Sequence, residues 1–355
     1  MNDISPFLKQ LISLPGLSGS EDPVRQVIAD TWKPLVDEMS VSKLGSLHAL
    51  RRAHDRPQAP SILFAAHMDA IGLIVTGIQE GGFLTVTEIG GVDPRILPGQ
   101  EVTVHGQRDL PGLAVLWPDR LLKNAHKGKT PSLGRILIDL ALPESEVKEL
   151  VRVGDRISFA TQPLDLAGGA LSGHTLDNRA SVAALTVCLE EIRKVELDWN
   201  VWMVATVEEE ETLAGAATSP YELAPDMVVA VDVTFAKGPG ASDYRAYSLD
   251  KGPTIGIGAN IHPFMRETFK KIAEKYEIPH AIEPMPKNSG TDAMLLQIVG
   301  SGIPCAVLGI PLRYMHTPVE EVVLADIERT GRLIAEFVRH LDADTLDTLH
   351  REMLP

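Results

Sequence analysis

SILFAAHMD, residues 61–69, is the stretch of this 355-residue chain that decides its fold. Residues Ile62 to Ala66 contain no polar side chain, and such a short apolar run is typical of a strand that is buried on both faces of a sheet. The run stops at His67-Met68-Asp69, so an imidazole and a carboxylate stand where the strand ends. Ligands of open α/β sheets bind at that edge, so this stretch predicts an α/β domain with a polar site there.

Helices and strands alternate from about Gly173 to the end of the chain. Buried-type strands are expected at Val201 to Val207, Met227 to Val233 and Pro304 to Ile310. Apolar residues at helical spacing predict helices at 178–194, 266–277 and 323–341. The order of these elements predicts an α/β fold with a mostly parallel sheet and helices on both of its faces.

The middle of the chain has a different character. It carries short β-type runs separated by Gly and Pro turns: Gly72 to Val75, Phe83 to Thr87, Glu101 to Val104 and Arg156 to Phe159. This pattern indicates a small all-β domain inserted into the α/β fold. We therefore expect a host domain made of residues 1–70 and 168–355, interrupted by an inserted β-barrel-like domain at 71–167.

Composition excludes some classes of partner. The formal net charge of −15 argues against nucleic acid, because binding to a polyanion requires Lys and Arg to neutralise phosphates. No uninterrupted apolar segment of about 18 residues occurs, so no membrane-spanning helix is expected. Cys188 and Cys305 each stand in an apolar run, as reduced core thiols do, and residues 1–14 lack the continuous apolar stretch of a signal peptide. These features favour a cytoplasmic protein.

Four predicted strands lead to His, Asp or Glu residues, which should meet at one edge of the sheet. They are His67, the run Glu208 to Glu211, Asp232 and His316. Buried carboxylates are costly unless they are paired or bind a cation, and few Lys or Arg residues stand near them in the sequence. Imidazole with carboxylate is the ligand set of zinc, cobalt or manganese. Two metal ions fit this much acid better than one.

Each of these residues also has a structural interpretation. His67 alone could be a core histidine, but Asp69 stands at i+2, on the same strand face, where it could hold the second imidazole nitrogen. The glutamate run could be a solvated loop, although it directly follows an apolar strand. Asp177 could be either a helix cap or a ligand, and His316 is uninformative by itself.

Taken together, the motifs of the chain match those of a known family. They are Leu14-Pro15-Gly16-Leu17-Ser18-Gly19-Ser20-Glu21, Ala66-His67-Met68-Asp69, Leu176-Asp177-Asn178-Arg179-Ala180, Thr206-Val207 with the glutamates and Gly215-Ala216, Val231-Asp232-Val233, Gly290-Thr291-Asp292-Ala293, and Arg313-Tyr314-Met315-His316-Thr317-Pro318-Val319-Glu320. In order and spacing the chain resembles the tetrahedral aminopeptidases, metallopeptidase family forty-two, which include glutamyl and deblocking aminopeptidases and have often been labelled cellulase or endoglucanase.

The resemblance implies a role for each site residue. His67 and Asp232 would bind one metal ion, Glu210 and His316 a second, and Asp177 would bridge the two. Glu209 would be the general base, and Asp69 would orient His67. The four consecutive glutamates replace the usual two, so this register rests on aligning Thr206-Val207 before them and Gly215-Ala216 after them. The resemblance also implies a cis peptide bond between Asp177 and Asn178.

The resemblance further implies a metal-dependent aminopeptidase that acts on peptide substrates and forms a homo-oligomer, a tetrahedral shell of twelve subunits assembled through the inserted domain. Two alternatives remain. The protein could be a non-catalytic scaffold that binds metal or peptides, although the retained Glu209 has no use in a purely structural site. It could also be a glycoside hydrolase, as the historical label suggests, but glycosidases usually need two carboxylates and no metal.

Overall fold

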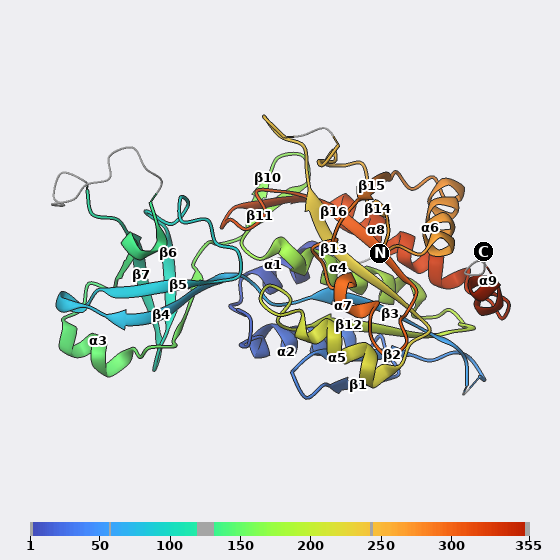
Figure 1. The fold of residues 1–355 in the computed structure, drawn as a ribbon, viewed down its shortest axis with the longest axis horizontal. Helices are drawn as coiled ribbons and strands as arrows, with labels where there is room; N and C mark the ends of the chain where they lie inside the picture. The colour runs from blue at the N-terminus through green and yellow to red at the C-terminus, as the bar shows by residue number, and fades with distance from the viewer. Residues whose placement is uncertain (1–2, 57, 119–130, 242–243, 352–355) are drawn as a thin grey trace.

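The computed structural model describes residues 3–56, 58–118, 131–241 and 244–351, and shows an elongated molecule with two parts (Figure 1). A small domain built mainly from β-strands lies at one end, and a larger domain of helices and strands forms the rest. The helices are α1 (Ser5–Ile12), α2 (Asp22–Trp32), α3 (Glu144–Leu150), α4 (Leu176–Ile192), α5 (Ala214–Leu223), α6 (Pro263–Lys275), α7 (Ala293–Leu296), α8 (Leu324–Arg339) and α9 (Thr345–Arg351).

The larger domain is built around one sheet, which has eleven strands among the described residues. Its strands are β1 (Glu38–Val41), β2 (Leu47–Arg51), β3 (Ser61–His67), β10 (Leu164–Leu166), β11 (Ala170–Gly173), β12 (Asn200–Thr206), β13 (Met227–Phe235), β14 (Thr254–Gly258), β15 (Ala281–Met285), β16 (Cys305–Arg313) and β17 (Glu320–Val323). The central strands β12, β3, β13 and β16 are neighbours and run parallel, so their carboxyl ends lie at the same edge.

Helices cover both faces of this sheet, as the sequence predicts. Alternate residues of β3 point to opposite sides: Phe64 packs with residues of α2, α4, α6 and α8, whereas Leu63 and Ala65 pack with Ala216 of α5 and Leu296 of α7. Residues 62–66 are all buried because apolar side chains leave water on both faces. Their burial fixes the strand that carries His67.

The prediction of a mostly parallel sheet was wrong. Among the described strands, four pairings of this sheet are parallel and six are antiparallel, so the sheet is mixed. Parallel neighbours require a long crossover, whereas antiparallel neighbours such as β1 and β2, or β10 and β11, are joined by short turns. The outermost strands β1 and β10 are short and largely exposed, so no apolar run marks them in the sequence.

The small domain is a closed barrel with the strand order β4-β5-β8-β7-β6-β9. Its strands are β4 (Gly72–Ile78), β5 (Leu84–Ile89), β6 (Glu101–His105), β7 (Asp109–Val115), β8 (Leu137–Asp139) and β9 (Arg156–Phe159). Its apolar cluster runs from Ile71 to Phe159 and is separate from those of the larger domain. β10 falls within the expected insert, 71–167, but pairs with β11 in the large sheet, so it belongs to the host fold.

Two other sequence expectations concern the whole molecule. No helix among the described residues is long and apolar enough to cross a membrane. Cys188 and Cys305 are both buried, and neither forms a disulfide. The sulfur atoms therefore pack as small apolar groups.

Candidate active site

Five side chains that the sequence singled out as ligands converge at the carboxyl edge of the central strands. His67 is the last residue of β3, and Asp232 lies near the end of β13. Glu210 follows β12, His316 follows β16, and Asp177 stands at the start of α4. Because the strands are parallel, their ends bring together residues that are distant in the sequence.

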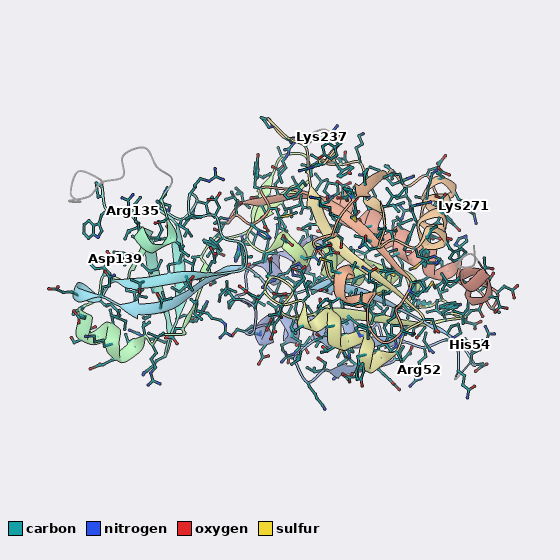
Figure 2. The ribbon with its side chains drawn as sticks, viewed as in Figure 1. Arg52, His54, Arg135, Asp139, Lys237 and Lys271 are labelled. Carbon is teal, nitrogen blue, oxygen red and sulfur yellow. The ribbon has the colours of Figure 1, made fainter. Side chains whose placement is uncertain are left out.

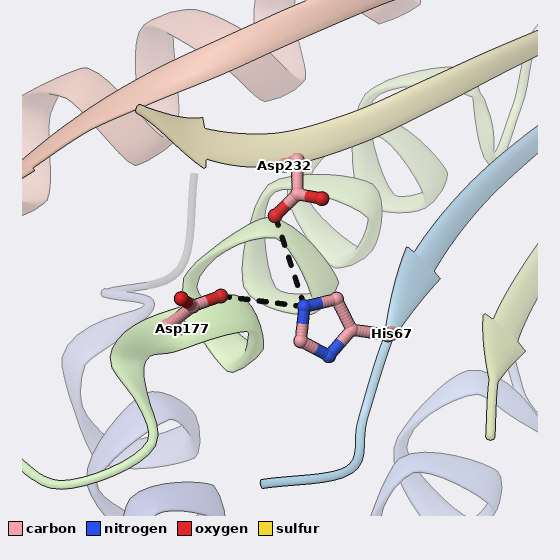
Figure 3. A group of neighbouring side chains, drawn as sticks. All are labelled: His67, Asp177 and Asp232. Atoms are coloured by element: carbon pink, nitrogen blue, oxygen red, sulfur yellow. Dashed lines mark ion pairs between the residues drawn. The ribbon is translucent and has the colours of Figure 1, made fainter. Parts of the chain in front are cut away.

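The converging residues form two groups, each with three ligand atoms within 4.8 Å of one another. The first group is His67, Asp177 and Asp232, which face one another in Figure 3. His67 Nε2 lies 3.3 Å from Asp177 Oδ1 and 3.8 Å from Asp232 Oδ1. All three side chains are buried.

The second group is Asp177, Glu210 and His316. His316 Nε2 lies 3.4 Å from Asp177 Oδ2 and 3.4 Å from Glu210 Oε2. Asp177 therefore faces one histidine with each of its carboxylate oxygens and is shared by both groups. Among the described interactions, both carboxylate oxygens of Asp177 face histidines and neither accepts a backbone N–H of α4, which favours the ligand interpretation over the helix-cap one.

Glu209 lies beside these groups but belongs to neither. Its Oε2 is 3.8 Å from His67 Nε2. Its backbone N–H donates to Asp69 Oδ1 at 3.0 Å, and the N–H of Glu210 donates to Asp69 Oδ2 at 3.2 Å. Asp69 thus fixes the backbone of both glutamates. The Glu210 side chain belongs to the second group, whereas the Glu209 side chain lies beside His67.

Asp69 also contacts His67 at Nδ1, the ring nitrogen that does not face Asp177 and Asp232. Its Oδ1 lies 3.4 Å from His67 Nδ1, an ion-pair contact rather than a well-formed hydrogen bond, and its Oδ2 accepts the Ser18 hydroxyl at 2.6 Å. Burial by itself would raise the pKa of Asp69, but His67 and Ser18 hold it below its usual value. A carboxylate at Nδ1 leaves Nε2 of the same ring directed at Asp177 and Asp232.

Comparison with known proteins agrees with this geometry. A family profile described as M42 glutamyl aminopeptidase matches residues 45–333. The chain belongs to the M42 peptidase family. It is therefore a hydrolase that acts on peptide bonds, and membership implies the use of divalent metal.

Several relatives match this M42 peptidase over nearly its whole length. The lysyl aminopeptidase of Pyrococcus furiosus is 35% identical, and the match covers 94% of this chain and 96% of that protein. The aminopeptidase APDkam598 from the archaeon Desulfurococcus kamchatkensis has the same fold, with a TM-score of 0.90, 32% identity and 98% coverage of both chains. The TET1 peptidase of Pyrococcus horikoshii, described as assembling into a tetrahedron or a large octahedral shell, has a TM-score of 0.84 at 29% identity, covering 95% of this chain and all of that one.

Glu320 is a residue of the M42 peptidase site for which the sequence motifs predict no role. Its Oε2 accepts the backbone N–H of Asp177 at 3.0 Å, and its Oε1 accepts the backbone N–H of His316 at 2.9 Å. One buried carboxylate thus fixes the main chain of two candidate ligands. The sequence placed Glu320 in the His316 motif, but nothing in that motif shows a bond to a residue near 177.

The barrel domain of the M42 peptidase also reaches the site. His316 Nδ1 lies 3.1 Å from the carbonyl oxygen of Gly91, in the segment after β5, and donates to it in the tautomer that leaves Nε2 free. A Cβ atom on Gly91 would lie 2.7 Å from that nitrogen, so only glycine permits the approach. Gly91 was not among the residues predicted from the sequence.

Asp292, in the Gly290-Thr291-Asp292-Ala293 motif, completes the acidic lining. It is buried and accepts the hydroxyl of Thr206, the last residue of β12. Burial raises its pKa to about 6. The charge of Asp292 contributes to raising the pKa of Glu209, although burial has the largest effect there and brings that pKa to about 9.

The donor set of this M42 peptidase fits divalent metal. The described residues show no Lys or Arg paired with Asp177, Glu209, Glu210 or Asp232, and the cationic side chains labelled in Figure 2, Arg52 and Lys271 among them, lie at the periphery of the molecule. Burial raises the pKa of Asp232 to about 8, and the charge of His67 offsets that effect only in part. Imidazole and carboxylate donors around a shared carboxylate suit hard or borderline divalent ions.

The peptide bond between Asp177 and Asn178 is cis, so this sequence prediction is confirmed. The Asn178 side chain donates to the carbonyl oxygen of Val231, the residue before Asp232, at 2.9 Å. The turn at Asp177 is thereby tied to β13, the strand that carries the neighbouring candidate ligand.

Proposed function

We propose that this chain removes N-terminal residues from peptides with the help of two divalent metal ions, with Glu209 as the general base. His67 and Asp232 would bind one ion, Glu210 and His316 the other, and Asp177 both. One observation carries the proposal: Glu209 Oε2 lies 3.8 Å from His67 Nε2, beside the first of two three-residue groups that share Asp177, and Glu209 belongs to neither group. A carboxylate in that position can handle protons instead of holding an ion.

The residues of the site would have different roles in the reaction. The ions, zinc, cobalt or manganese, would supply Lewis acidity to the scissile carbonyl and to the attacking water. Glu209 would take a proton from that water at Oε2 and deliver it to the leaving amine. Asp69 and the Gly91 carbonyl hold the two imidazole rings by their Nδ1 atoms, which keeps both Nε2 atoms directed inward.

Assembly is the second part of the proposal. We infer a homo-oligomer, a tetrahedral dodecamer, in which the barrel domain carries subunit contacts. Support comes from the P. horikoshii neighbour, which is described as assembling into a tetrahedron or a large octahedral shell, and from the barrel's position at one end of the molecule (Figure 1). Two buried, unpaired cysteines suit a reducing compartment, which favours the cytoplasm.

Two other functions are weaker. A non-catalytic scaffold would need no carboxylate beside the two ligand groups, yet Glu209 is there. A glycoside hydrolase would need a carboxylate pair without metal, whereas the acids at this site face two imidazoles. Activity on a cellulosic substrate that resists chelation would favour the glycosidase, and inactivity of metal-loaded protein on all aminoacyl substrates would favour the scaffold.

The decisive experiment compares glutamine variants along the glutamate run. Glu209→Gln should abolish hydrolysis of aminoacyl chromogenic substrates while metal content stays near two ions per subunit. Glu210→Gln should lose metal. Glu208→Gln is the matched control, because that side chain accepts the Thr212 hydroxyl and contacts neither histidine among the described interactions. Swapped results for 209 and 210 would show that the assignment is wrong by one residue.

A further inference from the structure

A buried carboxylate without a cationic partner lies close to the candidate active site. Glu283, on β15, accepts the hydroxyl of Thr234 at 2.7 Å through Oε1 and the hydroxyl of Thr254 at 2.5 Å through Oε2. Among the described residues no Lys, Arg or His forms an ion pair with it. Burial raises the pKa of Glu283, and the two hydroxyls only partly offset that effect.

The position of Glu283 follows from strand register. Thr234 stands two residues after Asp232 on β13, so both side chains point to the same face of the sheet. Gly309 of β16 is the register partner of Asp232, and a Cβ atom on Gly309 would lie 3.1 Å from Glu283 Oε2. The carboxylate therefore covers Gly309, roughly 5 to 10 Å from Asp232, given about 4.8 Å between strands and about 3.3 Å per residue.

The surroundings of Glu283 leave it within reach of a ligand. The residue is partly exposed although its carboxylate is largely enclosed. Tyr247 is near enough that its pKa, raised to about 12 mainly by burial, is also raised by the Glu283 charge. An anion in such a place is stabilised by a cation, and the part of the chain that the structure describes supplies two hydroxyl donors but no cationic partner.

We propose that Glu283 forms the subsite for the side chain of the substrate's N-terminal residue and that it selects lysine and arginine. This inference rests on the proposed function. With the N-terminal residue held at the ligand groups, a long side chain that runs along the α5 and α7 face past Gly309 would bring its cation to the carboxylate. The four-carbon stem of lysine and the fork of arginine span a distance of this order. A negative N-terminal residue would meet repulsion there.

A purely structural role for Glu283 makes a different prediction. Its two hydrogen bonds join β15 to β13 and β14, so the residue could merely brace the edge of the sheet. In that case, loss of a hydrogen bond would matter and loss of charge would not. Glu283→Gln removes the charge and keeps an acceptor, whereas Thr254→Val removes one hydrogen bond and keeps the charge.

The test measures kcat/KM of the full-length, metal-loaded protein on Lys, Arg, Leu and Glu p-nitroanilides. Wild type should favour Lys and Arg over Leu, with Glu the poorest. Glu283→Gln should lower kcat/KM for Lys and Arg at least tenfold, mainly through KM, and for Leu less than threefold, while Thr254→Val keeps the preference for Lys. Glu267→Gln removes an exposed charge on α6 and should change none of these ratios.

Three results would overturn the subsite: a wild-type preference for Leu or Glu, an equal loss on all substrates in Glu283→Gln, or loss of the Lys preference in Thr254→Val. Calorimetry with lysine amide and norleucine amide, which differ in the terminal ammonium, tests the subsite without turnover. Tighter binding of lysine amide that disappears in Glu283→Gln supports the subsite even if no peptide is cleaved. Equal affinities would refute it even in an active enzyme, so the two proposals fail separately.

Discussion

Removing divalent metal with a chelator should make the stability of this protein fall steeply as the pH rises from about 6 to 7. In the metal-free site, burial raises the pKa of Glu209 to about 9 and that of Asp232 to about 8. In the unfolded chain such carboxylates ionise near pH 4. Burial also raises the pKa values of Glu210 and Glu320 well above the usual range. The folded protein therefore binds at least two more protons than the unfolded chain throughout this pH range. Because the folded-state pKa values are raised, the free energy of unfolding decreases with rising pH.

The expected slope follows from that proton count. Each additional proton bound by the folded state costs about 1.4 kcal/mol of stability per pH unit, so two or more protons give a loss of about 2.7 kcal/mol or more between pH 6 and 7. The slope depends on both pKa values lying above this range and not on their particular values. Asp177 does not contribute, because its pKa is lowered and it is ionised in both states at these pH values.

Urea unfolding of chelated and metal-loaded protein at pH 6 and pH 7 measures this slope. The free energy of unfolding of the metal-loaded protein should depend little on pH, because bound cations keep the carboxylates ionised in the folded state. Asp232→Asn removes one of these protons and should lower the slope of the chelated protein by about 1.4 kcal/mol per pH unit. Equal slopes with and without metal, or an unchanged slope in Asp232→Asn, would refute the proposed electrostatics.

Three further predictions concern packing around the site and between the domains. Gly91→Ala should weaken metal binding by roughly 10 to 100-fold, because its Cβ would displace the His316 ring; titration with metal measures this, and Gly134→Ala, whose Cβ meets open space in the same domain, should bind metal like wild type. Phe269→Ala should lower the free energy of unfolding by about 3 to 5 kcal/mol, because the fully buried ring stacks on Phe337 at 3.9 Å; a loss under about 1 kcal/mol in urea unfolding would contradict this packing. Deleting about Gly72 to Gln162 should leave a folded but smaller assembly with damaged activity, because the barrel has its own core and Gly91 is lost with it; a full-sized oligomer by light scattering would show that the barrel does not carry assembly.

Sequence patterns located the central strands well, because a strand that is buried on both faces is a continuous apolar run in the sequence. β3 and β13 are continuous apolar runs, and each places a charged or imidazole side chain at or near its end. The outer strands leave no such mark. β1 and β10 are mostly exposed, and the direction in which they pair depends on short turns, so a mixed sheet could not be read from apolar runs alone.

The candidate ligands could be predicted from the sequence because His, Asp and Glu side chains are recognisable metal ligands. The groups that position these ligands could not be predicted. Glu320 acts through the backbone N–H groups of Asp177 and His316, and Gly91 acts through its carbonyl oxygen. Backbone donors and acceptors are the same in every residue, so no residue type signals which of them will be used. Glu283 was also missed, since a single acid on an edge strand ordinarily faces solvent.

The contact between the Gly91 carbonyl and His316 joins two domains that have separate apolar cores. Coupling between two equilibria is reciprocal. If a shift of the barrel weakens ligand binding at His316, a bound ligand must make that shift less favourable. If contacts with neighbouring subunits hold the barrel in position, metal binding and shell formation are thermodynamically coupled. A subunit outside the shell would hold its metal less tightly, and metal starvation would loosen the shell.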